Sequence, residues 1–231
     1  MKTAILLCEH FENQRAARPD AKPYEELFVE LLGEEKNPPT VFDIKSGDFP
    51  QSARDFDKYI ITGSLSSSYD ADKWIAELKQ FIVSAFGRGD AKQIGICFGH
   101  QIIADALGGK VAPNPNGWGV GKRFSQIKSP FLKKYFPSGK FALEYSHHDI
   151  VVNPPNDAEI LSGSDFCAVE SMKIGEKILT FQGHPEFDAI YSDMLFNAFK
   201  NLFGEVAVQR REQSIQIPAD NKKIAQIIRE F

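Results

Sequence analysis

Hydrophobic and polar positions follow two different rhythms in the first half of the chain. Short apolar runs predict strands at 3–8, 40–44, 57–62 and 92–97. Between and after these runs, apolar residues recur at helical spacing and predict helices at 23–33, 72–89 and 99–109. Such alternation of strand and helix predicts an open, mostly parallel sheet with helices on both faces.

The pattern changes after residue 109. Residues 110–182 carry short extended runs separated by Gly, Pro and Asn, which predict a small antiparallel β element in this second half. A helical pattern returns at 186–204, and a last helix at about 218–231 carries Ile224, Ile227, Ile228 and Phe231 on one face. We expect one α/β domain over 1–231, with that helix packed on the domain or on a partner.

Composition excludes several classes of function. The chain has 231 residues, of which 42% are hydrophobic, and its net charge of -4 does not favour nucleic acid or an anionic membrane as a partner. The apolar stretch from Ala4 to Cys8 is too short for a signal peptide, and no run approaches the roughly 18 residues of a membrane span. Three cysteines indicate a reducing, cytoplasmic environment rather than a disulfide scaffold.

One cysteine, Cys97, lies in the sequence "GICFG", after a predicted strand and before a predicted helix. The G-x-S-x-G version of this arrangement is the nucleophile elbow, a strained turn that needs small flanking residues. The helix that follows directs its amide dipoles at the sulfur and favours the thiolate, and the backbone N–H of Phe98 could receive an oxyanion. The alternative is a buried structural cysteine beside closely packed glycines.

A cysteine nucleophile needs a base and a group that orients the base. His184 follows a strand pattern in "KILTFQGHPEF", and the extended conformation favoured around Pro185 turns His184 and Glu186 to the same side. His100 is a poor candidate because it lies inside the predicted helix. A zinc site of Cys97, His100 and His147 is conceivable, but it lacks the paired spacing of known zinc motifs. We therefore predict no metal and no cofactor, and a structural role for Cys8 and Cys167.

The segments "GICFGHQ", "ITGS" and "FQGHPEF" together resemble the class I glutamine amidotransferases, which use a Cys-His-Glu triad. The chain is most similar to the stand-alone cytosolic subgroup that includes γ-glutamyl peptidases, through "NPNGWGVG" and "SHHDIVV". The resemblance implies a flavodoxin-like fold. It also implies a small-molecule substrate that carries a γ-glutamyl group.

The resemblance also implies a role for each matching residue. Cys97 would be the nucleophile, His184 the base and acid, and Glu186 the group that orients the histidine. Gly63 and Phe98 would supply the two oxyanion amides, although a Gly-Ser turn alone would be unremarkable. The substrate would be bound by the following residues: Gln101, His147 and Asp149. His148 departs from the subgroup, which often has glutamine there, so the substrate preference stays open.

These roles predict hydrolysis of a γ-glutamyl amide bond through a thioester, with no cofactor. Two catalytic variants remain open at this stage: a γ-glutamyl peptidase without ammonia transfer, and a glutaminase subunit that serves a separate synthase. A third alternative is a binding or regulatory module that keeps the fold without turnover.

Overall fold

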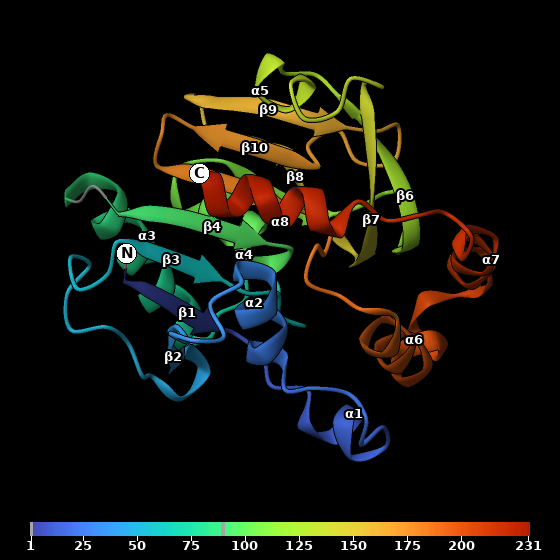
Figure 1. The fold of residues 1–231 in the computed structure, drawn as a ribbon, viewed down its shortest axis with the longest axis horizontal. Helices are drawn as coiled ribbons and strands as arrows, with labels where there is room; N and C mark the ends of the chain where they lie inside the picture. The colour runs from blue at the N-terminus through green and yellow to red at the C-terminus, as the bar shows by residue number, and fades with distance from the viewer. Residues whose placement is uncertain (1, 89–90) are drawn as a thin grey trace.

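A single large sheet organises the computed structural model, which describes residues 2–88 and 91–231. Its strands are β1 (Thr3–Leu7), β2 (Thr40–Asp43), β3 (Lys58–Ile61), β4 (Lys92–Ile96), β6 (Gly119–Ile127), β7 (Lys140–His147), β9 (Ala158–Gly163), β10 (Ser171–Ile174) and β11 (Ile178–Phe181). Within the described residues these nine strands lie in the order β2-β1-β3-β4-β11-β10-β9-β6-β7 (Figure 1).

The sheet is parallel in one half and antiparallel in the other. Strands β2, β1, β3, β4 and β11 run parallel, while β10, β9, β6 and β7 pair antiparallel. A second small sheet joins β5 (Lys110–Pro113) to β8 (Asp149–Asn153). The predicted α/β fold with a mostly parallel sheet and a small antiparallel element is confirmed. Most of the antiparallel strands, however, extend the main sheet instead of standing apart from it.

The helices are α1 (Glu12–Ala16), α2 (Tyr24–Leu32), α3 (Lys73–Arg88), α4 (Phe98–Ala106), α5 (Pro130–Lys133), α6 (Ala189–Phe203), α7 (Glu205–Ser214) and α8 (Asn221–Glu230), with a 3-10 turn η1 (Ile44–Ser46).

The predicted helix 72–89 corresponds to α3, and its predicted last residue, Gly89, lies outside the described residues. The helix predicted at 186–204 begins three residues later than expected, because Asp188 caps it by accepting a hydrogen bond from the backbone of Tyr191. The sequence pattern did not indicate α7.

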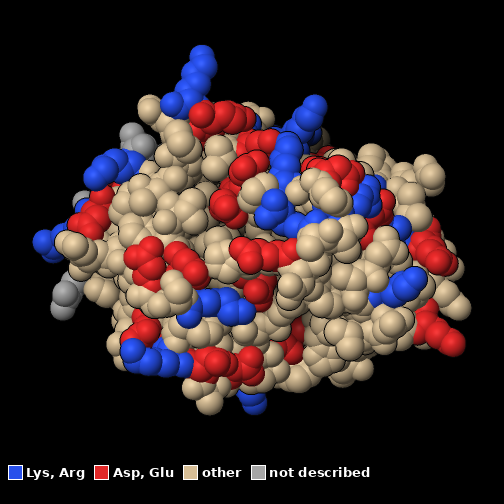
Figure 2. All heavy atoms as spheres, turned by 90° about the horizontal axis from the view of Figure 1, so that it is seen from below, with Lys and Arg blue, Asp and Glu red and all other residues tan. Residues whose placement is uncertain are grey.

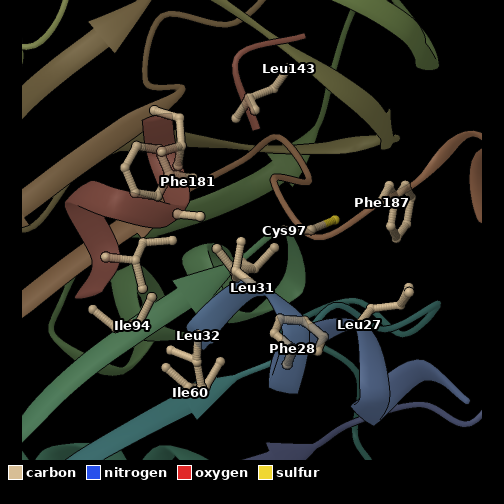
Figure 3. Packing of buried hydrophobic residues seen from close by; sticks show 14 of the residues in the cluster. Leu27, Phe28, Leu31, Leu32, Ile60, Ile94, Cys97, Leu143, Phe181 and Phe187 are labelled. Carbon is tan, nitrogen blue, oxygen red and sulfur yellow. The ribbon is translucent and has the colours of Figure 1, made fainter. Parts of the chain in front are cut away.

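Alternate residues of the parallel strands build two hydrophobic cores, one on each face of the sheet. Ile5 and Ile60 pack with α2 and α8, whereas Leu6 and Ile61 pack with α3 and α4. Figure 3 shows the first of these cores, with Leu31 and Phe28 of α2 packed under the strands and Cys97 at the end of one of them. The carboxyl ends of the central strands therefore rest on a rigid, fully packed layer.

The last helix, α8, lies on the body of the fold beside α2 (Figure 1). Its residues Ile224, Ile227 and Ile228 are buried. The ammonium of the buried Lys58 donates a hydrogen bond of 2.8 Å to the carbonyl of Ile228, near the end of the helix. This bond satisfies one of the terminal carbonyls that an isolated helix leaves unpaired.

The surface carries charges of both signs. Acidic and basic side chains are interleaved on the face shown in Figure 2, which agrees with the modest net charge of -4. Of the helices among residues 2–88 and 91–231, none is long and apolar enough to cross a membrane.

Candidate active site

Cys97 connects β4 to α4 with φ 53° and ψ -104°, a left-handed backbone that residues other than glycine rarely adopt. Hydrogen bonds hold the turn on both sides. The Cys97 amide donates to the carbonyl of Phe181 at 2.9 Å, and its own carbonyl accepts from the amide of Gln101 at 3.1 Å. Hydrogen bonds to the neighbouring strand and to the following helix thus hold Cys97 in its strained backbone conformation, as the elbow interpretation requires.

The two glycines that flank the cysteine allow close packing of helix on sheet. A Cβ on Gly95 would lie 2.5 Å from the carbonyl oxygen of Gly99, and a Cβ on Gly99 would lie 2.1 Å from the carbonyl oxygen of Ile61. Real Cβ atoms do not approach backbone this closely. Any side chain at either position would push α4 away from the sheet and displace Cys97.

His184 and Glu186 follow β11 and form a buried pair. Nδ1 of His184 lies 2.7 Å from Oε1 of Glu186, and the two side chains are almost fully enclosed. Because a carboxylate only accepts, the Nδ1 proton of His184 is donated to Glu186. The imidazole also stacks on Phe187, with ring centroids 3.9 Å apart. Its backbone amide donates to the carbonyl of Glu144 at 2.8 Å, so both the ring and the main chain of His184 are held in place.

The electrostatics of His184 favour its protonated form. Burial alone lowers the pKa of an imidazole, but the Glu186 carboxylate and the Cys97 sulfur raise the pKa of His184 to about 10. Nε2, the nitrogen not bonded to Glu186, makes no hydrogen bond to any described residue. The thiol of Cys97 instead contacts the carbonyl of Ser146 at 3.8 Å. The Cys97 sulfur therefore lies near enough to His184 to raise the pKa of the imidazole.

Gly63, at the end of β3, completes this cluster. A Cβ on Gly63 would lie 3.6 Å from Cβ of Cys97 and 3.3 Å from Cε1 of His184, so the three residues meet at one point. They follow β3, β4 and β11, which are neighbouring parallel strands. Their meeting point is therefore the carboxyl edge of the sheet, where open α/β folds place their binding sites.

The two predicted oxyanion amides differ in their surroundings. The N–H of Phe98 belongs to the first residue of α4, where a helix leaves its amides without a partner inside the helix. The N–H of Gly63 donates to the hydroxyl of Tyr24 at 3.2 Å. That same hydroxyl donates to Oε1 of Glu186 at 3.1 Å. The Gly63 amide can reach an oxyanion only by sharing or exchanging its bond to Tyr24.

Tyr24 contacts the predicted site residues and was not indicated by the sequence. It belongs to α2 and is buried, and its ring packs edge-on against those of Phe11 and Phe28. Burial and the nearby Glu186 carboxylate raise the pKa of Tyr24 well above its usual value, so the hydroxyl keeps its proton. In the sequence it occupies an ordinary core-facing helical position, and only its two polar contacts distinguish it.

Gln101 and His147 converge on the backbone carbonyl of Asp149, at 2.9 Å in each case. Nε2 of His147 lies 3.3 Å from the guanidinium of Arg123, which has only donors, so this nitrogen accepts and Nδ1 carries the proton. Burial and the positive charge of Arg123 hold the pKa of His147 well below its ordinary value. This environment therefore favours the neutral form of His147.

The three predicted substrate residues, Gln101, His147 and Asp149, line a cavity of about 400 Å³ together with Cys97. The carboxylate of Asp149 accepts a hydrogen bond of 2.6 Å from Ser67 and lies 3.3 Å from Nδ1 of His148. Trp118 also lines this cavity. The structure thus brings the predicted nucleophile and the predicted substrate residues to one opening.

The zinc alternative finds no support in the arrangement of its residues. Nδ1 of His100 pairs with the hydroxyl of Thr180 at 2.7 Å, and burial lowers the pKa of His100 to about 3. Among the described residues, no three His, Cys, Asp or Glu side chains gather as a metal site would require. Burial raises the pKa of Cys8 and of Cys167 to about 12, which disfavours the thiolate form of both residues.

Comparisons with known proteins identify the family and the fold of the chain. A family model described as glutamine amidotransferase class-I matches residues 22–202. The chain is 34% identical over 171 residues to γ-glutamyl peptidase 2 of Arabidopsis thaliana, covering 71% of this chain and 68% of that protein. It is 40% identical over 95 residues to one subunit of the glutamine-hydrolysing GMP synthase of Methanococcus aeolicus, covering 40% of this chain and 50% of that one. A glutamine amidotransferase of Thermotoga maritima superposes with a TM-score of 0.74 at 16% identity, covering 100% of this chain and 97% of that chain.

Proposed function

The chain belongs to the class I glutamine amidotransferase family, as the sequence motifs predicted, and on this premise we propose that Cys97, His184 and Glu186 hydrolyse a γ-glutamyl amide bond. The protein is a cysteine hydrolase of the glutamine amidotransferase type. One observation supports the assignment of residues above all others: a left-handed Cys97 and a buried His184–Glu186 pair follow adjacent parallel strands, and Cys97 and His184 line one small recess.

The reaction begins at the sulfur of Cys97. A thiolate attacks the γ-carbonyl carbon of the substrate, and the negative charge moves to the carbonyl oxygen. The amides of Phe98 and Gly63 stabilise this oxyanion, the latter after its hydrogen bond to Tyr24 is shared or exchanged. His184, whose pKa is raised to about 10, is protonated and donates its proton to the departing nitrogen.

The second half of the reaction returns the enzyme to its starting state. His184 removes a proton from water, which attacks the thioester, and the carbon–sulfur bond breaks to release glutamate. Glu186 keeps the imidazole oriented and stabilises its positive charge in both halves. No metal or organic cofactor is required for any of these steps.

The polar part of the cavity suits the charged end of a γ-glutamyl group. The carboxylate of Asp149 is a natural partner for the α-ammonium of the substrate, and we propose it for that role. Gln101 and His147 line the same wall and share the Asp149 carbonyl, which makes this wall rigid before the substrate binds.

A second candidate function is that of a glutaminase subunit that passes ammonia to a separate synthase. The similarity to one subunit of a GMP synthase favours this possibility, but it covers 40% of the chain. The similarity to γ-glutamyl peptidase 2 covers 71% of the chain and favours a hydrolase that releases its products to solvent. We therefore take the stand-alone hydrolase as the primary proposal.

One experiment tests the catalytic assignment. The purified protein is incubated with glutamine and with γ-glutamyl amides of other amines, and the released glutamate and ammonia are measured. We expect Cys97→Ala to lose all turnover, whereas Cys167→Ala, a change at a buried thiol outside the site, should keep it. A glutamine-analogue electrophile should label wild-type protein at Cys97 alone. Turnover that survives Cys97→Ala would contradict the proposal.

A further inference from the structure

A buried ion pair lies next to the wall of the substrate cavity. It joins Arg123 of β6 to Glu170, the residue before β10. Nε of Arg123 and one terminal nitrogen of its guanidinium lie 3.0 and 2.9 Å from the same carboxylate oxygen of Glu170. The side chain of Glu170 is fully enclosed, and that of Arg123 is 21% exposed. Because desolvation offsets the attraction within such a pair, a buried ion pair is weak evidence for a role in stability.

The guanidinium of Arg123 is held by rings as well as by the carboxylate. Its central carbon lies 4.0 Å from the ring centroid of Tyr145 and 4.6 Å from that of Phe166. The hydroxyl of Ser125 donates to the Glu170 carboxylate and lies 2.6 Å from the hydroxyl of Tyr145. A planar guanidinium with these contacts has little freedom to turn. The position of its remaining N–H donors is therefore fixed.

These donors reach His147, which lines the cavity. A terminal nitrogen of Arg123 lies 3.3 Å from Nε2 of His147, and a guanidinium can only donate. Nδ1 of the neutral ring then carries the proton, which it donates to the carbonyl of Asp149 at 2.9 Å. A Cβ on Gly119, the partner of His147 in the β6–β7 pairing, would lie 2.9 Å from Nε2, so a side chain there would crowd the ring. The imidazole thus has one tautomer and one orientation.

The opposite tautomer of His147 would lose both of these contacts. A proton on Nε2 would face the donors of Arg123, and a bare Nδ1 would face the carbonyl of Asp149, so two acceptors would oppose each other at 2.9 Å. The same carbonyl accepts a hydrogen bond of 2.9 Å from Gln101. A change of tautomer would therefore remove one of the bonds that hold the main chain of Asp149 at the cavity wall.

We propose that Arg123, held by Glu170, is a positioning residue for substrate binding; this inference rests on the function proposed above. Arg123 fixes the tautomer and the orientation of His147, and His147 fixes Asp149 where the α-ammonium of the γ-glutamyl group binds. Arg123 acts through His147 and not on the substrate, since it is not among the described residues that line the cavity. Its removal should weaken substrate binding and leave the chemistry at Cys97 largely intact.

The charges around His147 give this arrangement a pH dependence. Burial, and then the positive charge of Arg123, hold the pKa of His147 well below its ordinary value of 6.5. An apolar group in place of the guanidinium removes that repulsion and leaves the enclosed Glu170 carboxylate unpaired, and both changes raise the pKa of His147. A protonated His147 would place a positive charge next to the proposed ammonium site. The other titratable groups beside this ring or across the site are Tyr145, His148, Asp149, His100 and His184.

Nitrogen-15 NMR of the histidine side chains tests the arrangement in the wild-type protein without any substrate. The signal of His147 is assigned by its loss in His147→Gln. We expect a protonated Nδ1 and an unprotonated Nε2 from about pH 8 down to about pH 5.5, a range in which an ordinary imidazole gains its second proton. A proton on Nε2, or titration of His147 near its ordinary value, would overturn the proposal.

Kinetics of two variants test the link to binding. Arg123→Met removes the charge and the donors. If His147 then titrates near its ordinary value, about one molecule in eleven keeps a neutral ring at about pH 5.5. The KM of Arg123→Met relative to wild type should therefore rise about tenfold between about pH 7.5 and about pH 5.5, with kcat within about twofold of wild type. Arg123→Lys keeps the charge and should keep the wild-type pH dependence. A flat KM ratio in Arg123→Met, or the same rise in Arg123→Lys, would contradict the proposal.

Two further variants separate positioning from stability. Arg123→Met combined with Glu170→Gln leaves no unpaired carboxylate in the core, and it should raise KM by about threefold or more at every pH, because nothing then fixes the tautomer of His147. A wild-type KM in this double variant would count against the proposal. Arg211→Met is the matched control, since Arg211 is 15% exposed, pairs with Asp193 and lies over the ring of Phe196, away from the cavity. If Arg211→Met and Arg123→Met change KM alike across the pH range, the effect is general destabilisation and the proposal fails.

Failure of the wider function would look different. If the wild-type protein hydrolyses no γ-glutamyl compound and the electrophile does not label Cys97, the catalytic assignment is wrong and this inference falls with it. If the wild type is active through Cys97 and Arg123→Met shows a wild-type KM at every pH, the catalytic assignment stands and only the role of Arg123 is rejected.

Discussion

The sharpest test of the site is the removal of one hydroxyl group, that of Tyr24. Tyr24→Phe deletes the oxygen that donates to Glu186 at 3.1 Å and accepts from the Gly63 amide at 3.2 Å. The ring itself remains, with its edge-on contacts to Phe11 and Phe28. The substitution therefore changes hydrogen bonding inside a packed core while leaving its volume nearly constant.

The two lost bonds set the size of the effect. A hydrogen bond to a charged group contributes about 1.5–3 kcal/mol, and one between neutral groups contributes about 0.5–1.5 kcal/mol. Both partners of Tyr24 are buried, so neither Glu186 nor the Gly63 amide gains water in exchange. We expect Tyr24→Phe to lower the free energy of unfolding by roughly 2–4 kcal/mol.

A second tyrosine in the same cluster supplies the control. The ring of Tyr191 stacks on that of Tyr24, with centroids 5.4 Å apart and planes 13° apart. The hydroxyl of Tyr191 is buried and has no hydrogen-bond partner among the described residues. Tyr191→Phe breaks no bond and removes an unsatisfied polar atom. Its free energy of unfolding should be unchanged or higher by about 1 kcal/mol.

Both variants would be measured by urea denaturation at pH 7 and by turnover of a γ-glutamyl substrate. Tyr24→Phe should also lower kcat by about tenfold, equivalent to about 1.4 kcal/mol in the barrier, because Glu186 loses a bond that orients it. Tyr191→Phe should retain wild-type kcat. Equal losses of stability in the two variants, or an unaltered kcat in Tyr24→Phe, would refute the account of Tyr24 as the link between Glu186 and Gly63.

Three further changes test other parts of the structure. Gly99→Ala forces a Cβ to within 2.1 Å of a β3 carbonyl oxygen and should lower the melting temperature markedly. Gly87→Ala is the control: its position in α3 has open space around it, and the change should raise the free energy of unfolding by about 1 kcal/mol. Glu186→Gln removes the main cause that raises the pKa of His184 to about 10. In wild-type protein, the raised pKa of His184 should contribute its full stabilisation below the unfolded pKa of about 6.5, and this contribution should be lost as the pH rises toward 10. The difference in free energy of unfolding between wild type and Glu186→Gln, measured by urea denaturation, should therefore shrink over this pH range. Asp149→Asn should raise KM about tenfold or more with a smaller change in kcat, and an unchanged KM would remove Asp149 from ammonium binding.

Local sequence was enough to predict the elbow and the edge of the sheet where it lies. Cys97 and its flanking glycines are adjacent in the chain, so their geometry follows from short-range sterics that the sequence displays directly. The carboxyl ends of neighbouring parallel strands share one edge, which is why residues as distant as Gly63 and His184 could be expected to converge.

Other features depended on packing that no local pattern encodes. Helix α7 has few apolar positions, with Ala207 and Ser214 as its buried residues, so its sequence carries little helical periodicity. The antiparallel strands were recognisable as short extended runs, but their order in the sheet was not. Strand order depends on pairing between strands that lie far apart in the sequence, and it therefore required the three-dimensional structure.

Tyr24 shows where sequence reasoning about an active site stops. Tyr24 and Tyr191 are both buried, both aromatic and both on core-facing helical positions, so the sequence makes them equivalent. Their hydroxyls differ only because the Tyr24 oxygen meets Glu186, 162 positions away, and Gly63, 39 positions away. Residues that carry out the chemistry need particular side chains and therefore form recognisable sequence motifs. Residues that position them need only lie at the correct place in the fold. Comparing Tyr24→Phe with Tyr191→Phe therefore measures a contribution to the site that is present only in the folded chain.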